Sequence, residues 1–116
     1  MANTMTEPVD MSGMSEREIL MHMISAFLMH YKTGQMSSDY YCGITGDILA
    51  NLSRHEVAGY TMCIECGAFD IAAKIEEHLY HLGFDIGNPN NKAGNGGNQN
   101  STIVYMIEKD TNYNPQ

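Results

Sequence analysis

A run of glycine and asparagine at residues 87–101, called the Gly/Asn-rich loop below, separates the last apolar segment from the rest of the chain. The run has too few apolar side chains to help build a core, so it predicts a loop. The segment that follows, Thr102 to Ile107, reads TIVYMI and is the most strand-like in the sequence. A loop this long in a small domain is either functional or disordered.

Two long segments before this loop carry apolar residues at helical spacing. The first, residues 15–32, opens with a capping box, in which the side chains of Ser15 and Glu18 each accept a hydrogen bond from the other residue's backbone amide. The second begins near residue 68 and ends at Gly83, because glycine adopts the left-handed conformation at little cost. We therefore expect two long helices.

Shorter elements are expected between these helices. Residues 39–45 and 60–66 are rich in residues that favour strands. Asp47 is placed to cap a short helix that ends near His55. The order helix, strand, helix, strand, helix, loop, strand predicts an α+β fold with a three-stranded sheet.

A chain of 116 residues is expected to form one domain. We place this single α+β domain at 14–108, with a flexible N-terminal tail at 1–13 and a polar C-terminal tail at 109–116. No run of 18 apolar residues suggests a transmembrane helix, and the N-terminus does not resemble a secretory signal. A cytoplasmic protein that does not enter a membrane is expected.

Charge constrains the partners of this protein. Six Lys and Arg residues oppose 14 Asp and Glu residues, which gives a net charge of −8. The basic residues are scattered, so direct binding to a nucleic-acid backbone is not expected. Net acidity favours a protein partner with a basic surface, although acidity also serves solubility alone.

Three cysteines are an odd number for a disulfide framework, and Cys63 and Cys66 form a CxxC pair without a second pair or histidines at zinc-finger spacing. Because the pair lies in an expected strand, its two side chains should point to opposite faces of the sheet. We interpret the cysteines as ordinary partly buried residues.

The stretch Tyr41-Cys-Gly43-Ile-Thr-Gly-Asp47 resembles the second signature strand of the GIY-YIG nucleases, the "YIG" element. The elements that follow, over roughly residues 39–108, resemble the family in order and spacing, and also resemble small phage and mobile-element proteins with the same shortened arrangement. The resemblance implies a small antiparallel GIY-YIG-like sheet.

The resemblance also implies a set of nuclease residues. Tyr41 would orient or deprotonate the attacking water, and Arg54 and His55 would act from the short helix. Glu76, which fits the family spacing better than Glu77, would hold a Mg²⁺ or Mn²⁺ ion that offsets charge and activates the water. Plain alternatives are a core position for Tyr41 and a solvated helix edge for the two glutamates.

Two departures from the family argue against catalysis. Asn51 stands where the family places its catalytic arginine, and a short neutral side chain supplies no cation to a phosphoryl oxygen. Arg54 lies about one helical turn further on, from where it would have to reach back. The helix at 15–32 replaces the first signature strand, and with that strand a second active-site tyrosine is lost.

We therefore expect a non-catalytic acidic binding protein without a cofactor. The resemblance suggests a phage-encoded inhibitor of a host nucleic-acid-targeting defence system, of the anti-CRISPR or anti-restriction kind. Its partner would be a basic protein, such as a host defence nuclease complex, in the host cytoplasm. The alternative is a weak metal-dependent endonuclease that uses Mg²⁺ or Mn²⁺.

A third hypothesis is a nucleotide-binding sponge. It would use the backbone amides of Gly94, Asn95, Gly96 and Gly97, which form a nest for an anion. No GK[ST] follows them, so this is not a Walker loop. A homodimer is also considered, because the first helix has a broad apolar face that the small sheet would not cover completely.

Overall fold

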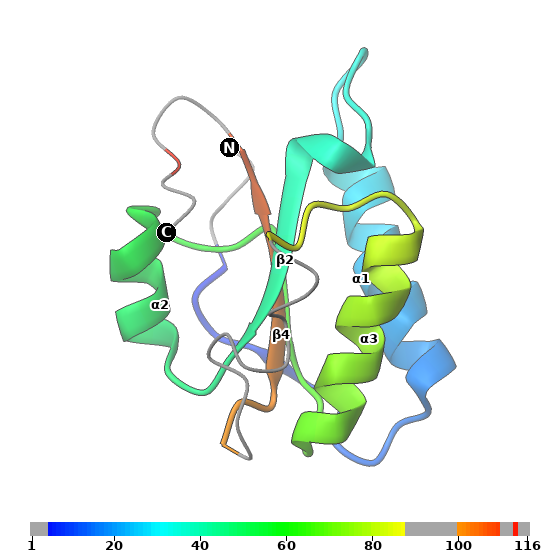
Figure 1. Ribbon diagram of the computed structural model, residues 1–116, viewed down its shortest axis with the longest axis vertical. Coiled ribbons are helices and arrows are strands. Elements are labelled where there is room, and N and C mark those ends of the chain that lie inside the picture. The colour runs from blue at the N-terminus through cyan, green and yellow to red at the C-terminus, as the bar shows by residue number, and fades with distance from the viewer. Residues whose placement is uncertain (1–4, 88–99, 110–112, 114–116) are drawn as a thin grey trace.

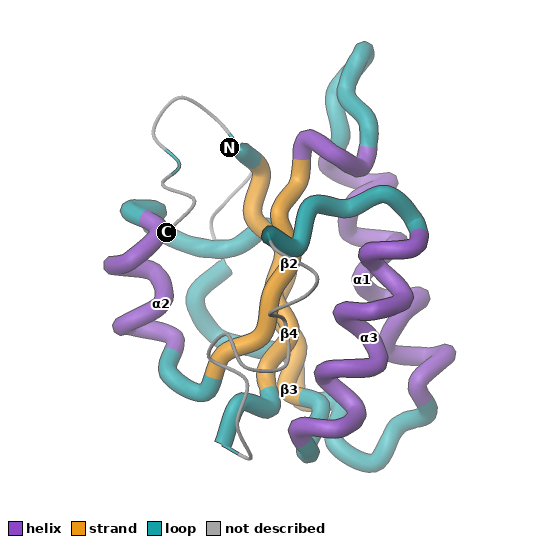
Figure 2. Tube along the Cα trace, viewed as in Figure 1, coloured by secondary structure: helices purple, strands orange, loops and turns teal. Residues whose placement is uncertain are grey.

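The computed structural model describes residues 5–87, 100–109 and 113. Three α-helices and a four-stranded sheet make up the fold (Figure 1). The helices are α1 (Glu16–His30), α2 (Ile48–His55) and α3 (Phe69–His81), and the strands are β1 (Val9–Asp10), β2 (Tyr40–Thr45), β3 (Met62–Glu65) and β4 (Ile103–Glu108). Helix α2 lies on one side of the sheet, and α1 and α3 lie on the other (Figure 2).

The sheet has the strand order β1-β3-β4-β2. Strand β4 pairs antiparallel with both β2 and β3, whereas β1 pairs parallel with β3. The predicted α+β class is confirmed, but the prediction of three antiparallel strands is wrong because the fourth strand, β1, makes the sheet mixed.

Strand β1 lies in the stretch that was predicted to be a tail, 1–13, so this prediction is wrong for residues 5–12. Val9 lies opposite Ile64 in the parallel pairing, and the amide of Met11 donates to a carbonyl of β3 at 3.0 Å. Both side chains of β1 are exposed, and Met11 is the buried anchor. The strand is held by its backbone, so no apolar alternation marks it in the sequence.

The prediction of a C-terminal tail at 109–116 is also wrong at two described positions, Lys109 and Tyr113, because both contact the rest of the domain. The Lys109 ammonium pairs with the Asp85 carboxylate at 3.0 Å, and the ring of Tyr113 packs against His55. The central part of the Gly/Asn-rich loop, including the predicted anion site at Gly94–Gly97, lies outside the described residues.

The helix ends follow the local chemistry that the sequence predicts. Ser15 and Glu18 form the capping box of α1, and Asp47 accepts the amide of Ala50 at 3.1 Å at the start of α2. Gly83 has a φ of 98° after α3, as expected for a left-handed helix terminator. These three predictions are confirmed.

Successive side chains of β2 point to opposite faces of the sheet and so belong to two separate core clusters. Tyr40 and Cys42 pack with α1 and α3, whereas Tyr41 packs with the cluster under α2. The predicted opposite orientation of the two neighbouring tyrosines is therefore confirmed, and Tyr40 is the fully buried one. The cysteines are free and buried, with Cys63 and Cys66 in different halves of the core, as the strand interpretation expects.

Helix α1 uses its apolar face for the core of its own chain. Ile19 and Met23 are completely buried, whereas Leu28 and Tyr31 at its C-terminal end are about half exposed. The homodimer stays a prediction. None of the described helices is long and apolar enough to cross a bilayer.

Candidate functional site

A buried hydrogen-bond network under α2 is centred on Asn51. The Tyr60 hydroxyl donates to Asn51 Oδ1 at 2.8 Å, and Asn51 Nδ2 donates to the Tyr105 hydroxyl at 3.2 Å. His55 Nε2 lies 3.0 Å from the same Tyr105 oxygen. All four side chains are at most 2% exposed. Asn51 therefore uses both ends of its amide to hold two tyrosines.

Sequence spacing explains why these side chains meet. Asn51 and His55 are four residues apart, so they lie on the same face of α2. Tyr105 lies on the face of β4 that is turned toward α2, and its Cα partner on β2 is Gly43. A Cβ at Gly43 would lie only 2.6 Å from the Tyr105 hydroxyl oxygen. Glycine is therefore the residue that leaves room for the Tyr105 ring.

Three aromatic rings, those of Tyr41, His55 and Tyr113, meet at the C-terminal end of α2. The ring of Tyr113 stacks on the His55 imidazole, with centroids 5.6 Å apart and an interplanar angle of 16°. Its centroid is 5.9 Å from that of Tyr41, which in turn lies 5.3 Å from His55. Tyr41 and His55 thus form a seat for a planar ring, called the aromatic seat below, and Tyr113 occupies it.

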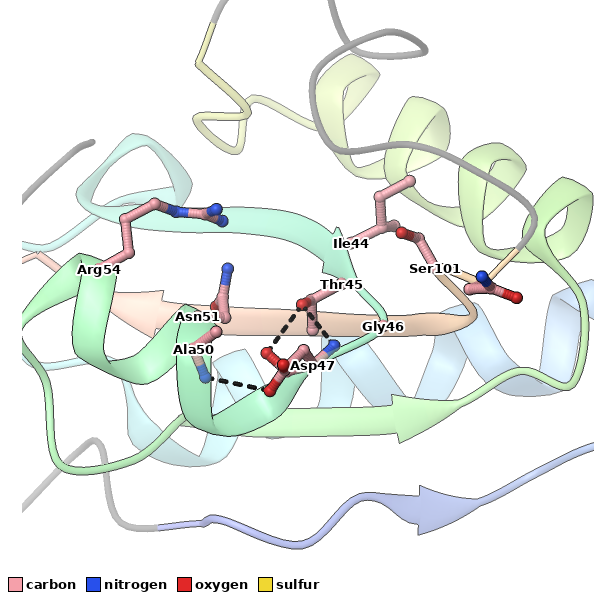
Figure 3. Close-up of a pocket in the computed structure, with 9 residues that line it drawn as sticks. Ile44, Thr45, Gly46, Asp47, Ala50, Asn51, Arg54 and Ser101 are labelled. Carbon is pink, nitrogen blue, oxygen red and sulfur yellow. Dashed lines mark hydrogen bonds between the residues drawn. The ribbon is translucent and has the colours of Figure 1, made fainter.

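A pocket of about 300 Å³ lies where β2 turns into α2. Figure 3 shows Arg54 reaching from α2 over this pocket, with Asn51 beneath it. Its lining residues are Ile44, Thr45, Gly46, Asp47, Ala50, Asn51, Arg54, Asn100 and Ser101. We call it the corner pocket. Its one lining cation, Arg54, has an exposed side chain and no carboxylate partner within the described residues.

Burial dominates the acid–base properties of this region. Burial raises the pKa of Tyr105 well above its usual value, with a smaller contribution from Tyr41. Burial also raises the pKa of Tyr41, and the charge of Glu76 raises it further. Arg54 lowers both values slightly, so its guanidinium lies close enough to act on the tyrosine cluster. The raised pKa values keep Tyr41 and Tyr105 in the neutral, hydrogen-bonding form near neutral pH.

Stability should fall as the pH rises above about 9. Burial raises the pKa of Cys66 from 9.0 to about 11, and burial with the charges of Glu108 and Asp39 raises that of Tyr40 from 10.0 to about 12. Folded protein keeps these protons while the unfolded chain loses them, so the free energy of unfolding decreases from about pH 9 toward pH 12. Urea unfolding at a series of pH values measures it, and a flat profile over this range would contradict the assignment.

Three of the predicted nuclease residues lie on the α2 side of the sheet, and the fourth, Glu76, comes from α3 but is close enough for its charge to act on Tyr41. Tyr41, Arg54 and His55 lie on the α2 side of the sheet. Glu76 belongs to α3, on the other side of the sheet, where it is 4% exposed, and its charge adds to the effect of burial in raising the pKa of both Cys42 and Tyr41. The neighbouring Glu77 is exposed. Glu76 is therefore a buried residue and not part of a solvated helix edge.

A shared metal centre does not emerge from the described part of the chain. No group of three His, Cys, Asp or Glu side chains gathers there in a way that would hold an ion. Mg²⁺ and Mn²⁺ prefer several oxygen ligands, and the surroundings of Glu76 include the Cys42 thiol and the apolar contacts of α3. These residues do not fit the ion that the resemblance implies.

Sequence reasoning missed Tyr60, Tyr105 and Tyr113. Tyr105 alternates with Ile103 and Ile107 along β4, and this period of two was a signal that it shares their face. Tyr60 and Tyr113 carry no local signal, because their partners Asn51 and His55 lie in a different segment of the sequence. No family model, curated protein or solved structure matches this chain.

Proposed function

We propose that this protein is a non-catalytic binding protein built on a nuclease-like scaffold. The observation that carries the proposal is the role of Asn51. The resemblance to GIY-YIG nucleases puts a catalytic arginine at this position, and here the position holds a buried amide that is engaged by Tyr60 and Tyr105. A residue fixed in this way supports the fold, and its short neutral side chain supplies no cation to a phosphoryl oxygen.

Glu76 supports the same proposal. Metal-assisted cleavage needs the ion, the water and the attacked phosphorus in one place. Glu76 is a buried residue of α3, whereas Arg54 and His55 belong to α2, which lies on the opposite side of the sheet (Figure 1). Arg54 lines the corner pocket, so its cation is available for binding, and Glu76 is not among the described residues that line this pocket.

Charge supports a basic protein partner. Three of the basic residues are already paired with carboxylates, namely Lys32 with Glu108, Lys74 with Glu16 and Lys109 with Asp85. The remaining surface charge is strongly negative, because the chain carries a net charge of −8. Such a surface attracts the basic groove of a nucleic-acid-binding protein. With the resemblance to phage proteins, this favours an inhibitor of a host nucleic-acid-targeting defence system.

A cleavage assay tests the non-catalytic part of the proposal. Plasmid and single-stranded DNA and RNA are incubated with the wild type, with Glu76→Ala and with the matched control Glu77→Ala, in Mg²⁺ and in Mn²⁺. We expect no cleavage by any of the three. Cleavage by the wild type and Glu77→Ala that disappears in Glu76→Ala would sink the proposal and establish the nuclease.

The partner is tested with purified defence complexes. We expect the protein to bind one class of guided or restriction nuclease, to inhibit its cleavage, and to lose affinity steeply as salt increases, because the contact is electrostatic. Full nuclease activity across such a panel at low salt, with no complex formed, would count against an inhibitor.

A weak endonuclease is the second candidate, and one observation favours it. The resemblance predicts the loss of a second active-site tyrosine, yet the ring of Tyr105 lies 6.1 Å from that of Tyr41, supplied by β4 next to β2. A second tyrosine therefore stands beside the YIG-like strand. The assay with Glu76→Ala and Glu77→Ala decides between the two candidates.

A further inference from the structure

We infer that the aromatic seat and the corner pocket form one binding site for a mononucleotide, whose base takes the place of Tyr113 and whose phosphate meets Arg54. This inference does not use the predicted anion site at Gly94–Gly97, although Asn100 and Ser101 at the end of the Gly/Asn-rich loop line the corner pocket. It is also independent of whether the protein inhibits a nuclease.

The contacts of Tyr113 show what the seat accepts. Its ring lies nearly parallel to His55 and close to Tyr41, which is the arrangement of stacked planar groups. The Tyr113 hydroxyl is buried and has no hydrogen-bond partner within the described residues. A buried hydroxyl without a partner costs about 1–3 kcal/mol. The seat therefore suits a flat ring better than it suits this tyrosine, which acts as a replaceable occupant.

Arg54 adds an anion-binding group next to the seat. It directly precedes His55 in α2, lines the corner pocket and has an exposed side chain. Lys32, Lys74 and Lys109 are each paired with a carboxylate, whereas no such pair engages Arg54 within the described residues. A guanidinium recognises phosphate through paired N–H donors. Within the described residues, an incoming phosphate would therefore not have to displace a carboxylate from Arg54.

The dimensions match a single nucleotide. The pocket volume of about 300 Å³ is at the lower end of the range for small-molecule sites. His55 of the seat and Asn51 of the pocket are four residues apart, about 6 Å along α2, so the seat and the pocket adjoin. Asp47 is also in the pocket, but it lies seven residues before Arg54, about 10 Å along the helix. Its carboxylate accepts the Ala50 amide as the cap of the helix.

The charge distribution selects a mononucleotide over a polymer. A nucleic-acid strand needs a track of cations, and the net charge of −8 opposes it. One phosphate needs one cation, which Arg54 supplies. An aromatic side chain from a partner protein would fill the seat but would leave Arg54 without an anion.

Calorimetric titration of the full chain tests the inference. The ligands are AMP, adenosine and ribose 5-phosphate, and the variants are Tyr113→Ala, Arg54→Gln and His55→Ala. We expect Tyr113→Ala to bind AMP about tenfold or more tighter than the wild type, because the competing occupant is gone. Two double variants complete the series. In the Tyr113→Ala background, Arg54→Gln removes a charged hydrogen bond to the phosphate and His55→Ala removes a stacking surface for the base. Each should weaken AMP binding by about tenfold or more.

Matched controls come from the other side of the molecule. Arg17→Gln removes an exposed arginine of α1, and Tyr31→Ala removes an exposed tyrosine that stacks on Phe27. Neither should change AMP binding. Adenosine or ribose 5-phosphate binding as tightly as AMP would overturn the inference, and so would AMP binding that is unaffected by Tyr113→Ala or by Arg54→Gln.

A spectroscopic variant covers the case in which Tyr113→Ala does not fold. The chain contains no Trp, so Tyr113→Trp introduces a single reporter in the seat. AMP should move its emission to longer wavelengths as the indole is displaced into water, and Arg54→Gln in the same background should suppress that shift. An emission spectrum that AMP leaves unchanged would overturn the inference.

Discussion

Asn51→Ala is expected to lower the free energy of unfolding by about 3 kcal/mol. The substitution removes both hydrogen bonds of the buried amide, and it leaves the hydroxyls of Tyr60 and Tyr105 short of a partner. Each lost bond contributes about 1 kcal/mol, and each stranded buried group adds a desolvation penalty. Urea unfolding followed by circular dichroism measures the change, which should also lower the melting temperature by roughly 10 °C or more.

The control for this prediction is Leu49→Ala. Leu49 lies two residues earlier in the same helix and is 79% exposed, so its truncation should change stability by less than about 0.5 kcal/mol. Equal stability of Asn51→Ala and Leu49→Ala would mean that the network does not support the fold. The buried Asn51 amide would then no longer support a non-catalytic scaffold.

Gly43→Ala should destabilise the protein by a similar amount, about 2–3 kcal/mol. The added Cβ would lie 2.6 Å from the hydroxyl oxygen and 2.8 Å from Cζ of Tyr105. The ring has to move, and this overpacking also strains its bonds to Asn51 and His55. Unfolding in urea, compared with the wild type, gives the size of the effect.

Two comparisons separate this clash from a general cost of replacing glycine. A Cβ added at Gly34 would have no atom within 4 Å, but the backbone there has a φ of 90°. Gly34→Ala should therefore lower the free energy of unfolding only by the backbone strain, about 1–2 kcal/mol. Tyr105→Phe removes the atom nearest to the new Cβ, so Gly43→Ala should be less harmful in that background. Additive effects in this double-mutant cycle would show that the contact does not determine the need for glycine.

Local chemistry made the helices and three of the strands predictable. The capping box at Ser15, the cap at Asp47 and the stop at Gly83 depend on neighbouring residues, and they appear where the sequence places them. The alternation of β2 likewise predicts that Tyr40 and Tyr41 face opposite ways. Patterns within about ten residues carry this information.

Contacts between distant segments were not predictable. Val9 and Asp10 form a strand only because β3 offers a free edge, and their own side chains are exposed. Tyr105 meets Asn51 across 54 residues of sequence. The burial of Glu76 depends on how α3 lies on the sheet, which helical spacing alone does not determine because Glu76 borders the apolar stripe. These features require the packed tertiary structure.

The central position of β4 has a consequence for how the chain is made. Strand β4 is the last strand in sequence and the inner partner of both β2 and β3, so neither has its antiparallel neighbour until residue 108 has left the ribosome. Folding therefore has to wait for a distant segment, and such non-local pairing is slow compared with helix formation. Until then β2 and β3 lack the strand that joins them, and unpaired strands with exposed apolar side chains are prone to aggregation.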